Sequence, residues 1–488
     1  MSWIDAGIFL TYMIALVAVG TYFLRRNTDQ EDYFVGGRGL SGWHIGLSVV
    51  ATDVGGGFSI GLGGLGFLMG LSGSWMLFTG LVGAWLAGAL LIPRVHALAL
   101  RERFLTFPQL IAHFYDGRAA FVAGLISVVG YLGFTSSQML AGAKLASAAF
   151  VDLDLNMALL VMGVITVGYT VLGGMKAVVY TDTIQWIVLI GGLSLVGVPL
   201  AWEAVGGWET IRATIRPEQL SLTNVDAVTL INWAVTIVPI WFVGMTLYQR
   251  IYACRSEKEA RKAWAIAGLL EWPLMAFLGV TLGLLARVAA DQGMFEGLAG
   301  ASAAELDPEL GLPLLLRTIL PAGLMGLMLS VYFSAILSTA DSCLMAASGN
   351  LLTDILARVT RVPQGTKGML RLSQWLTLAL GAVAILIAAM MENVLDLMLS
   401  SYAFMVSGLL VPLVAAVFGG RRNARAAIGA MLGGGFTTIA LGKAPFVLPY
   451  GLDANVFGIA MAAIIFLSID RLMPVGGTPL VNGGISTS

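Results

Sequence analysis

The sequence is poor in charged residues and in cysteine, and each shortage argues against a class of function. Only 11% of its 488 residues are Asp, Glu, Lys or Arg, against about 25% in an ordinary soluble domain. The formal net charge of −1 gives no electrostatic basis for binding nucleic acid, which needs clustered basic residues. The two cysteines, Cys254 and Cys343, provide neither a disulfide framework nor a metal-ligand spacing. Redox chemistry is therefore not expected.

Apolar residues, in contrast, make up 58% of the chain and are gathered in long blocks. Thirteen blocks are long enough to cross about 30 Å of hydrocarbon as helices. The first lacks the basic start and the small-residue cleavage site of a signal peptide, so we expect it to be retained. We predict an all-α polytopic membrane protein with a single membrane domain, 1–488. The predicted spans are 4–24, 43–70, 74–93, 119–149, 157–173, 178–201, 229–248, 263–288, 319–350, 371–391, 394–419, 424–441 and 453–470.

The distribution of basic residues predicts the orientation of the chain. Lys and Arg concentrate in the loops after odd-numbered spans, whereas the loops after even-numbered spans are neutral or acidic, as in residues 289–312. Basic loops remain in the cytoplasm. We therefore expect a cell-membrane protein with its N-terminus outside and its C-terminus in the cytoplasm. The loop after the seventh span, for example, contains Arg250, Arg255, Lys258, Arg261 and Lys262.

A glycine pattern, G-x-G-x-x-G at 61–66, lies inside the second span. In dinucleotide-binding folds this pattern follows a strand, and an acidic residue comes about 20 positions later. Neither condition holds here. Because small residues at such spacings let membrane helices approach closely, we interpret these glycines as packing residues.

The segment "ATDVGGGF" at 51–58 has a different meaning. Three consecutive glycines after Asp53 are poor helix formers. An interrupted helix at membrane depth is tolerated where its freed carbonyl groups line a cavity, and such breaks bind ions and solutes in secondary transporters. We therefore expect a functional break in the second span.

The ninth span carries a polar group, "SAILSTADSCLMAAS". Ala335, Ser338, Thr339 and Ser342 are spaced to share one helical face. Membrane Ser and Thr commonly bond their own backbone, but Asp341 lies among them, and an intramembrane carboxylate costs at least about 2.5 kcal/mol unless it is compensated. Hydroxyls, carboxylates and freed carbonyls are hard oxygen donors. The group therefore suits sodium or a proton better than a soft metal.

Several segments, taken in order, resemble the sodium:solute symporter family, which includes sodium/proline, sodium/glucose, sialic acid and choline transporters. The resemblance covers most of the chain and implies a leucine-transporter-like core of two inverted five-helix repeats, each beginning with an unwound helix. The repeats would be 43–201 and 229–419, with an extra helix at 4–24 and two C-terminal helices within 424–470. The segments are "EDYFVGGRGL", "ATDVGGGF", "TVLGGMKAVVYTDTIQ", "YQRIYACRSEKEARKA" and "AILSTADSCLMAAS".

The resemblance also implies two sodium sites. The main site would use the backbone carbonyls of Ala51, Val54 and Ala335 and the hydroxyls of Ser338 and Thr339.

A further sodium site of some family members maps to Asp182, Ser338, Asp341 and Ser342. From its position alone, Asp182 is explained equally well as an acid at the cytoplasmic interface. Two acids near one site repel unless a cation or a proton lies between them. A second sodium ion and a coupled proton therefore both stay open.

The solute cavity implied by the resemblance lies beside the broken helices. For each of its aromatic candidates, ordinary helix packing is at least as good an explanation. The segment "ATDVGGGF" resembles that of choline transporters but differs at Asp53, so it does not identify the solute. The candidate residues are Asp53, Gly55, Gly56, Phe134, Gln138, Trp241 and Tyr402.

We expect sodium-coupled import of a small organic solute by alternating access, with sodium as the coupling ion and no enzymatic activity. The solute would be an amino acid, a betaine or choline-like compound, a sugar, a sialic acid or a carboxylate. A proton-coupled symporter is the nearest alternative. A membrane sensor or enzyme on the same scaffold is a weaker one, because no nucleophile motif or metal cluster is visible. The sequence does not indicate the oligomeric state.

Overall fold

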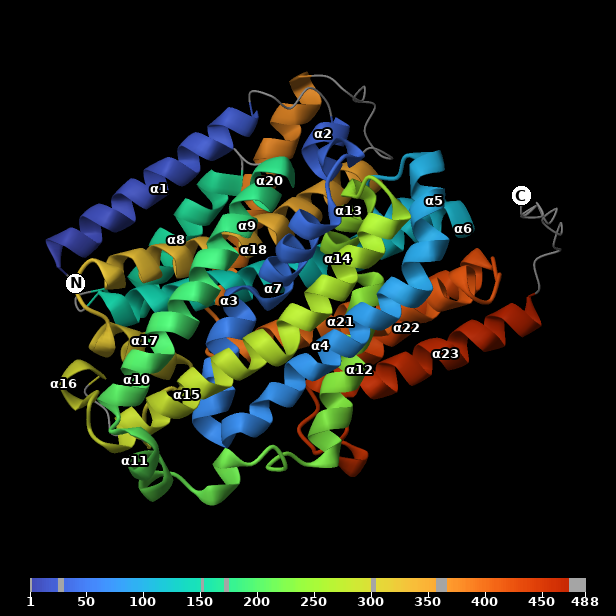
Figure 1. Cartoon of the computed structure of the whole chain (residues 1–488). Coiled ribbons are helices and arrows are strands. Elements are labelled where there is room, and N and C mark those ends of the chain that lie inside the picture. Colours follow the sequence, from blue (N-terminus) through green and yellow to red (C-terminus); the bar gives the residue numbers. More distant parts are fainter. Residues whose placement is uncertain are drawn as a thin grey trace.

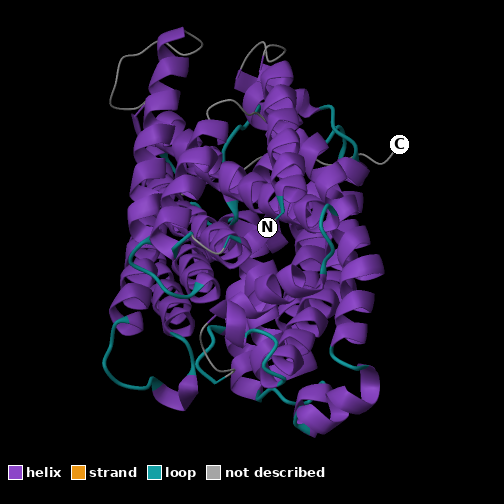
Figure 2. Ribbon diagram, turned by 90° about the vertical axis from the view of Figure 1, so that its left-hand side faces the viewer, coloured by secondary structure: helices purple, strands orange, loops and turns teal. Residues whose placement is uncertain are grey.

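The computed structural model describes residues 2–24, 30–150, 153–170, 175–299, 304–356 and 367–473. Over these residues the chain is helical, and its one β-bridge, between Leu40 and Cys254, belongs to no strand. Figure 2 shows the helices packed side by side. The long α1 lies at one edge of the bundle, and α22 and α23 lie at the opposite edge (Figure 1).

Short 3₁₀ or π-helical segments connect several helices of the first half. A 3₁₀ turn, η2 (Gly70–Ser74), joins α3 to α4, and the π-helical segments η3 (Ala87–Leu91) and η4 (Leu193–Gly197) continue α4 into α5 and α9 into α10. The helices are α1 (Trp3–Leu24), α2 (Gln30–Val35), α3 (Gly42–Met69), α4 (Trp75–Leu86), α5 (Ile92–Glu102), α6 (Phe107–Phe114), α7 (Gly117–Ala149), α8 (Leu155–Thr170), α9 (Met175–Gly192) and α10 (Val198–Ala204).

The second half begins with the short surface helix α11 (Gly207–Thr214). The π-helical segments η6 (Leu270–Met275) and η7 (Leu351–Leu356) follow α14 and α18. The remaining helices are α12 (Ala227–Val243), α13 (Met245–Ala253), α14 (Glu257–Leu269), α15 (Ala276–Asp291), α16 (Glu296–Ala299), α17 (Pro308–Ile319), α18 (Leu324–Asn350), α20 (Lys367–Ala388), α21 (Val394–Val417), α22 (Ala424–Gly442) and α23 (Ala454–Leu472).

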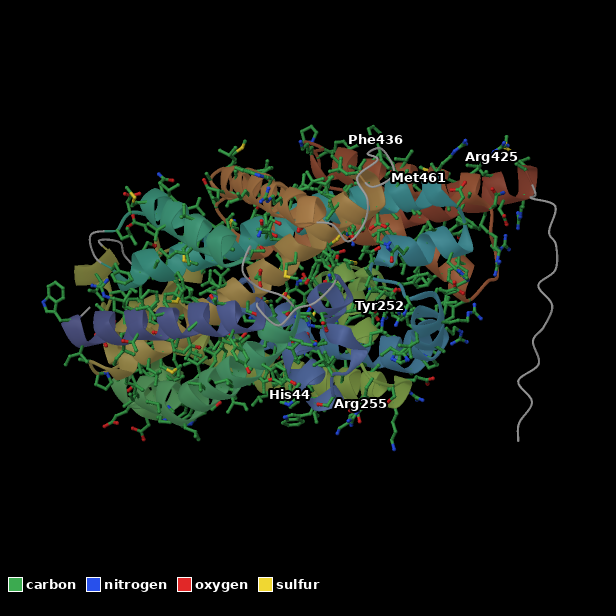
Figure 3. All side chains as sticks on the ribbon, turned by 90° about the horizontal axis from the view of Figure 1, so that it is seen from above. His44, Tyr252, Arg255, Arg425, Phe436 and Met461 are labelled. Atoms are coloured by element: carbon green, nitrogen blue, oxygen red, sulfur yellow. The ribbon has the colours of Figure 1, made fainter. Side chains whose placement is uncertain are left out.

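Each of the thirteen predicted spans overlaps one of these helices or a continuous run of them. Among the described residues, ten helical segments are long and apolar enough to cross a membrane, or eleven if the bent pair α12 and α13 counts as one span. The helix α8 is apolar but shorter. The part of α3 that begins at Ile60 forms one continuous segment with α4 and α5, Ile60–Glu102. Apolar side chains also cover the outside of the bundle, as at Phe436, which is 74% exposed (Figure 3). The chain is a multi-pass membrane protein.

The glycines of the G-x-G-x-x-G pattern pack α3 against its neighbours, as predicted. A Cβ at Gly66 would lie 2.3 Å from the backbone oxygen of Val280 on α15. A Cβ at Gly283, also on α15, would lie 2.0 Å from the backbone oxygen of Gly63. The two backbones touch, so no larger residue fits at these positions.

Among the described residues, the backbone of three membrane helices is broken. In α3 the break is at Gly55 (φ 33°, ψ −162°). The first helix of the second predicted repeat is bent by 43° at Gly244, between α12 and α13. Both breaks lie where the family resemblance implies unwound helices. The third, at Trp272 (φ −136°, ψ 122°) in η6, was not expected.

Two segments that were predicted to be loops are partly buried in the helical bundle, so these two predictions are wrong. The seventh span does not end at residue 248, because α13 continues to Ala253 and Arg250 is completely buried. Part of the acidic segment 289–312 is also buried: Glu309 at the start of α17 is 6% exposed and lies 2.6 Å from Lys144 Nζ. In both cases an oppositely charged side chain elsewhere in the bundle compensates the charge, and local hydropathy does not detect such a partner.

Candidate functional site

Residues of the predicted main sodium site meet where the break of α3 touches α18. The hydroxyl of Thr339 lies 3.0 Å from the backbone oxygen of Ala51 and 3.1 Å from that of Ala335. Val54 directly precedes the break at Gly55. A single side chain on α18 thus contacts both its own helix and the interrupted helix 288 residues earlier in the chain.

Glycine is required at the break for two reasons. The positive φ of Gly55 is a conformation that residues with a side chain rarely adopt. A Cβ at Gly55 would also lie 2.7 Å from Thr339 Oγ1, and one at Gly56 would lie 2.2 Å from the Ile336 side chain. The glycine run therefore allows α3 to be interrupted and to lie directly against α18.

Gln138, predicted to face the solute, also contacts the break. Its Oε1 accepts a hydrogen bond of 2.9 Å from the backbone N–H of Gly56, and both residues are buried. This bond satisfies an amide that regular helix would otherwise pair. The side chain of Gln138 thus stabilises the interrupted backbone.

The predicted second sodium site is built around Asp182 on α9. Ser338 donates a hydrogen bond to Asp182 Oδ1, and Ser48 donates one of 2.5 Å to Oδ2. The Nη2 atom of Arg250 lies 3.7 Å from Oδ2, and both charged side chains are completely buried. Asp182 is therefore buried inside the bundle, with a guanidinium beside it.

Arg250 is the charged residue of this group that the sequence patterns did not assign to the site, and its partners Ser48 and Thr52 were not predicted either. Its guanidinium donates hydrogen bonds to Ser48 (3.0 and 3.1 Å), to Thr52, to Ser342 (3.3 Å) and to the backbone oxygen of Thr246 (3.2 Å). The signal was present in the sequence, because a buried Asp182 requires a positive partner.

Asp341 stands apart from this network. It is completely buried, and neither carboxyl oxygen receives a hydrogen bond from the residues that the structure describes. The structure thus places Asp182, Ser338 and Ser342 in one hydrogen-bonded group with Arg250, and Asp341 near it, beside the Thr170 side chain.

Several predicted solute residues lie together. The hydroxyl of Tyr402 donates a 3.2 Å hydrogen bond to Asp53 Oδ1, and the Phe134 ring meets the Tyr402 ring edge-on, with centroids 4.9 Å apart. Trp241 lies in different surroundings: it packs against Gly83 and edge-on against Trp264 at 6.3 Å. The described contacts of Trp241 favour helix packing over solute binding.

Glu271, absent from the predicted set, joins this group. Its carboxyl lies within hydrogen-bonding reach of the Asp53 carboxyl, and the side chain is completely buried. A single acid inside the apolar segment "LLEWPLM" could have pointed to it, since intramembrane acids are a functional signal by default.

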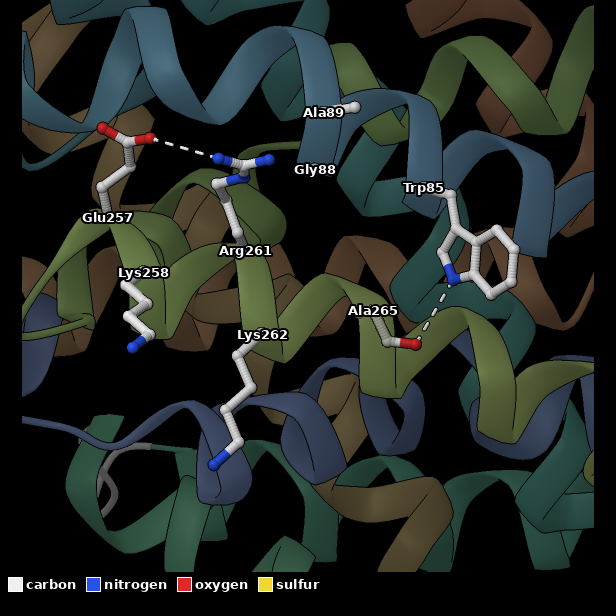
Figure 4. A pocket seen from close by; sticks show the side chains of 8 residues that line it. All are labelled: Trp85, Gly88, Ala89, Glu257, Lys258, Arg261, Lys262 and Ala265. Carbon is white, nitrogen blue, oxygen red and sulfur yellow. Dashed lines mark hydrogen bonds and ion pairs between the residues drawn. The ribbon is translucent and has the colours of Figure 1, made fainter.

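A surface hollow of about 680 Å³ lies elsewhere, between α14 and the junction of α4 with α5 (Figure 4). None of the predicted sodium or solute residues lines it. It is therefore distinct from the site in the bundle centre. Its lining residues are Trp85, Gly88, Ala89, Glu257, Lys258, Arg261, Lys262 and Ala265.

Comparison with known proteins agrees with the family resemblance seen in the sequence. Residues 33–434 match the profile of the sodium:solute symporter family. The chain is 26% identical to the osmoregulated proline transporter OpuE of Bacillus subtilis, over 88% of this chain and 86% of that protein. It is 25% identical to sodium/glucose cotransporter 1 of Oryctolagus cuniculus, over 85% of this chain and 67% of that protein.

Two solved structures share the fold. A substrate-bound, outward-open Na⁺-coupled sialic acid symporter matches with a TM-score of 0.77 at 21% identity, over 96% of this chain and 98% of that chain. The nucleobase-cation-symport-1 family transporter Mhp1, in a closed conformation, matches with a TM-score of 0.57 at 13% identity, over 91% and 95% of the two chains.

Proposed function

The chain belongs to the sodium:solute symporter family, and we propose from this premise that it imports a small organic solute together with sodium by alternating access. The observation that carries the proposal is the contact of Thr339 on α18 with the carbonyl of Ala51 beside the break of α3. Relatives named as proline and glucose transporters support a transport function, and sodium coupling is the property that names the family.

The proposed sodium site consists of the carbonyls of Ala51, Val54 and Ala335 and the hydroxyls of Ser338 and Thr339. These are neutral, hard oxygen donors, which suit a small hard cation. Because they come from two helices, a sodium ion among them would hold the interrupted helix against α18. Sodium binding would thereby complete the solute site at the same break.

One sodium ion is sufficient to drive useful uptake. Moving one charge down a membrane potential of 100 mV releases about 2.3 kcal/mol. Since about 1.4 kcal/mol corresponds to a factor of ten, this energy concentrates a solute about fifty-fold before any chemical gradient of sodium is added.

We propose that the second site, Asp182, Ser338, Asp341 and Ser342, does not need a second sodium ion. The guanidinium of Arg250 already lies 3.7 Å from Asp182 and donates to Ser342. A cation tethered to the chain thus supplies the charge that sodium would otherwise provide. The pair anchors α13 to α9.

The interruptions support the assignment of two repeats at 43–201 and 229–419. Each proposed repeat starts with a broken helix, α3 in the first and the bent pair α12 and α13 in the second. The helix α1 precedes the first repeat, and α22 and α23 follow the second. The proposed orientation has the N-terminus outside and the C-terminus in the cytoplasm.

Thermal stability of the purified protein in sodium against potassium tests the proposed function. We expect sodium to raise the melting temperature and potassium at equal ionic strength to leave it unchanged. Equal effects of the two salts would contradict sodium coupling. Sodium-free activity that a protonophore abolishes would favour the proton-coupled alternative.

A further inference from the structure

Two carboxyl groups face one another beside two helix breaks. Asp53 lies two residues before the break of α3 at Gly55, and Glu271 directly precedes the break of η6 at Trp272. Their carboxyls are within hydrogen-bonding reach. Asp53 is 5% exposed and Glu271 is completely buried. Two interrupted elements thus each contribute an acid to one place.

The backbone of α4 leaves room for the Glu271 carboxyl. A Cβ at Gly80 would lie 2.3 Å from Glu271 Oε2. Any residue larger than glycine at this position would displace the carboxyl. The acid therefore lies in a niche formed by α3, α4 and η6.

Within the part of the chain that the structure describes, the pair has no positive partner. Among the described residues, none of the salt bridges involves Asp53 or Glu271. Asp53 Oδ2 and both Glu271 oxygens accept no hydrogen bond from a described donor. Two other buried acids differ, because Asp182 has Arg250 and Glu309 has Lys144. A buried pair of acids without such a partner needs a cation or a shared proton between its carboxyl groups.

Aromatic rings adjoin Asp53. The Tyr402 hydroxyl donates to Asp53, and the rings of Tyr402 and Phe134 form an edge-on pair with centroids 4.9 Å apart, with both side chains buried. Carboxylates combined with aromatic faces form the environment that binds organic ammonium groups, through charge and cation–π attraction. Sodium prefers a shell of several oxygen ligands. The neighbouring group of oxygen atoms around Thr339, rather than the acid pair, provides such a shell.

We propose that Asp53 and Glu271 together bind a cationic nitrogen, an amine or quaternary ammonium, of the transported solute. This inference rests on the proposed function and assigns its solute a chemical class. The two acids would hold the nitrogen directly, and Tyr402 would orient Asp53. Glu271 becomes a solute-binding residue on an element for which the family resemblance predicted no role.

The test uses the full-length protein and its Glu271→Gln variant, with thermal stability measured in sodium. The probes form matched pairs: choline with the uncharged alcohol in which carbon replaces its nitrogen, and L-proline with N-acetylproline. Methylammonium serves as the smallest cation, and D-glucose, myo-inositol and N-acetylneuraminate serve as solutes without a cationic nitrogen. Asp354→Asn is the control, because Asp354 is also buried but bonds Thr106 and Thr353 away from the pair.

We expect a charged member of the pairs to stabilise the wild-type protein and its uncharged partner to have no effect. In Glu271→Gln the apparent affinity for that cation should fall about 30-fold or more, while Asp354→Asn should retain it. Stabilisation by sodium alone should persist in Glu271→Gln, which shows that the variant folds and that sodium coupling is intact.

Three results would overturn the proposal. One is sodium-dependent stabilisation by a sugar, inositol or sialic acid that Glu271→Gln leaves unchanged. Another is an absence of any effect from all cationic probes, including methylammonium. The third is loss of stabilisation by sodium alone in Glu271→Gln, which would make the pair a sodium site. Failure of the proposed function is distinguishable, because the wild-type protein would then not respond to sodium at all.

Discussion

The guanidinium of Arg250 lies 3.7 Å from the carboxylate of Asp182, and both side chains are completely excluded from solvent. The pair joins α13 of the second proposed repeat to α9 of the first. It also positions Ser48, which donates to Asp182 and accepts from Arg250. Charge inside the bundle is therefore organised by contacts between the two halves of the chain.

Removing one partner of this pair should destabilise the protein strongly. Arg250→Ala leaves Asp182 buried without its cation, and we expect a loss of about 3–5 kcal/mol. Equilibrium unfolding in detergent micelles measures it. The control is Arg255→Gln, because Arg255 is 59% exposed in its pair with Glu259 and should contribute less than about 1 kcal/mol. An Arg250→Ala variant as stable as that control would contradict the ion pair.

Gly55→Ala should abolish sodium-dependent stabilisation. The new Cβ would lie 2.7 Å from Thr339 Oγ1, and the residue would retain a positive φ of 33°, which is strained for alanine. Melting temperatures in sodium and potassium give the readout. Gly191→Ala on α9 is the matched control, because nothing lies within 4 Å of its Cβ position. This control should retain the sodium response, with stability unchanged or raised by up to about 1 kcal/mol.

Lys144 should be essential for the packing of α17. Its Nζ lies 2.6 Å from carboxylate oxygens of both Asp307 and Glu309, and its side chain is 2% exposed. Glu309 also accepts hydrogen bonds from the first backbone amides of α21. Lys144→Met should cost about 3–5 kcal/mol in unfolding experiments. The comparison is Arg287→Met, whose pair with Asp291 is partly exposed; equal losses in the two variants would disprove a special role for Lys144.

The number of sodium ions per protein should be one, and Asp341→Asn should not change it. The reason is that Arg250 already supplies a cation to the second site. Saturation binding of radioactive sodium counts the ions. Two ions in the wild-type protein and one in Asp341→Asn would establish a second sodium site and refute the role given to Arg250.

The sequence predicted the helical architecture well, because it depends on local signals, and the same kind of signal suggested the proposed sodium group. Long apolar blocks mark the helices, the glycine run marks the break of α3, and helical spacing places Ala335, Ser338 and Thr339 on one face. The contact of Thr339 with Ala51 agrees with the residues proposed for the sodium site.

The sequence patterns could not predict ion pairs between residues that are far apart in the chain. Arg250 was assigned to a loop because hydropathy cannot register that Asp182, 68 positions earlier, neutralises it. Glu309 was assigned to a loop for the same reason, since Lys144 is 165 positions away. Glu271 was missed because a single acid in an apolar run gives no indication of the element it faces.

The most direct test of the central claim, that sodium binds between the break of α3 and α18, is equilibrium binding of radioactive sodium to the purified protein and to Thr339→Ala. We predict saturable binding that unlabelled sodium displaces and potassium does not, with an affinity about tenfold weaker in Thr339→Ala because one oxygen ligand is lost. Thr377→Ala, which removes a hydroxyl that donates to the Ser373 carbonyl within α20, should bind sodium like the wild type. An absence of saturable binding, or identical isotherms for the wild type and Thr339→Ala, would contradict the account.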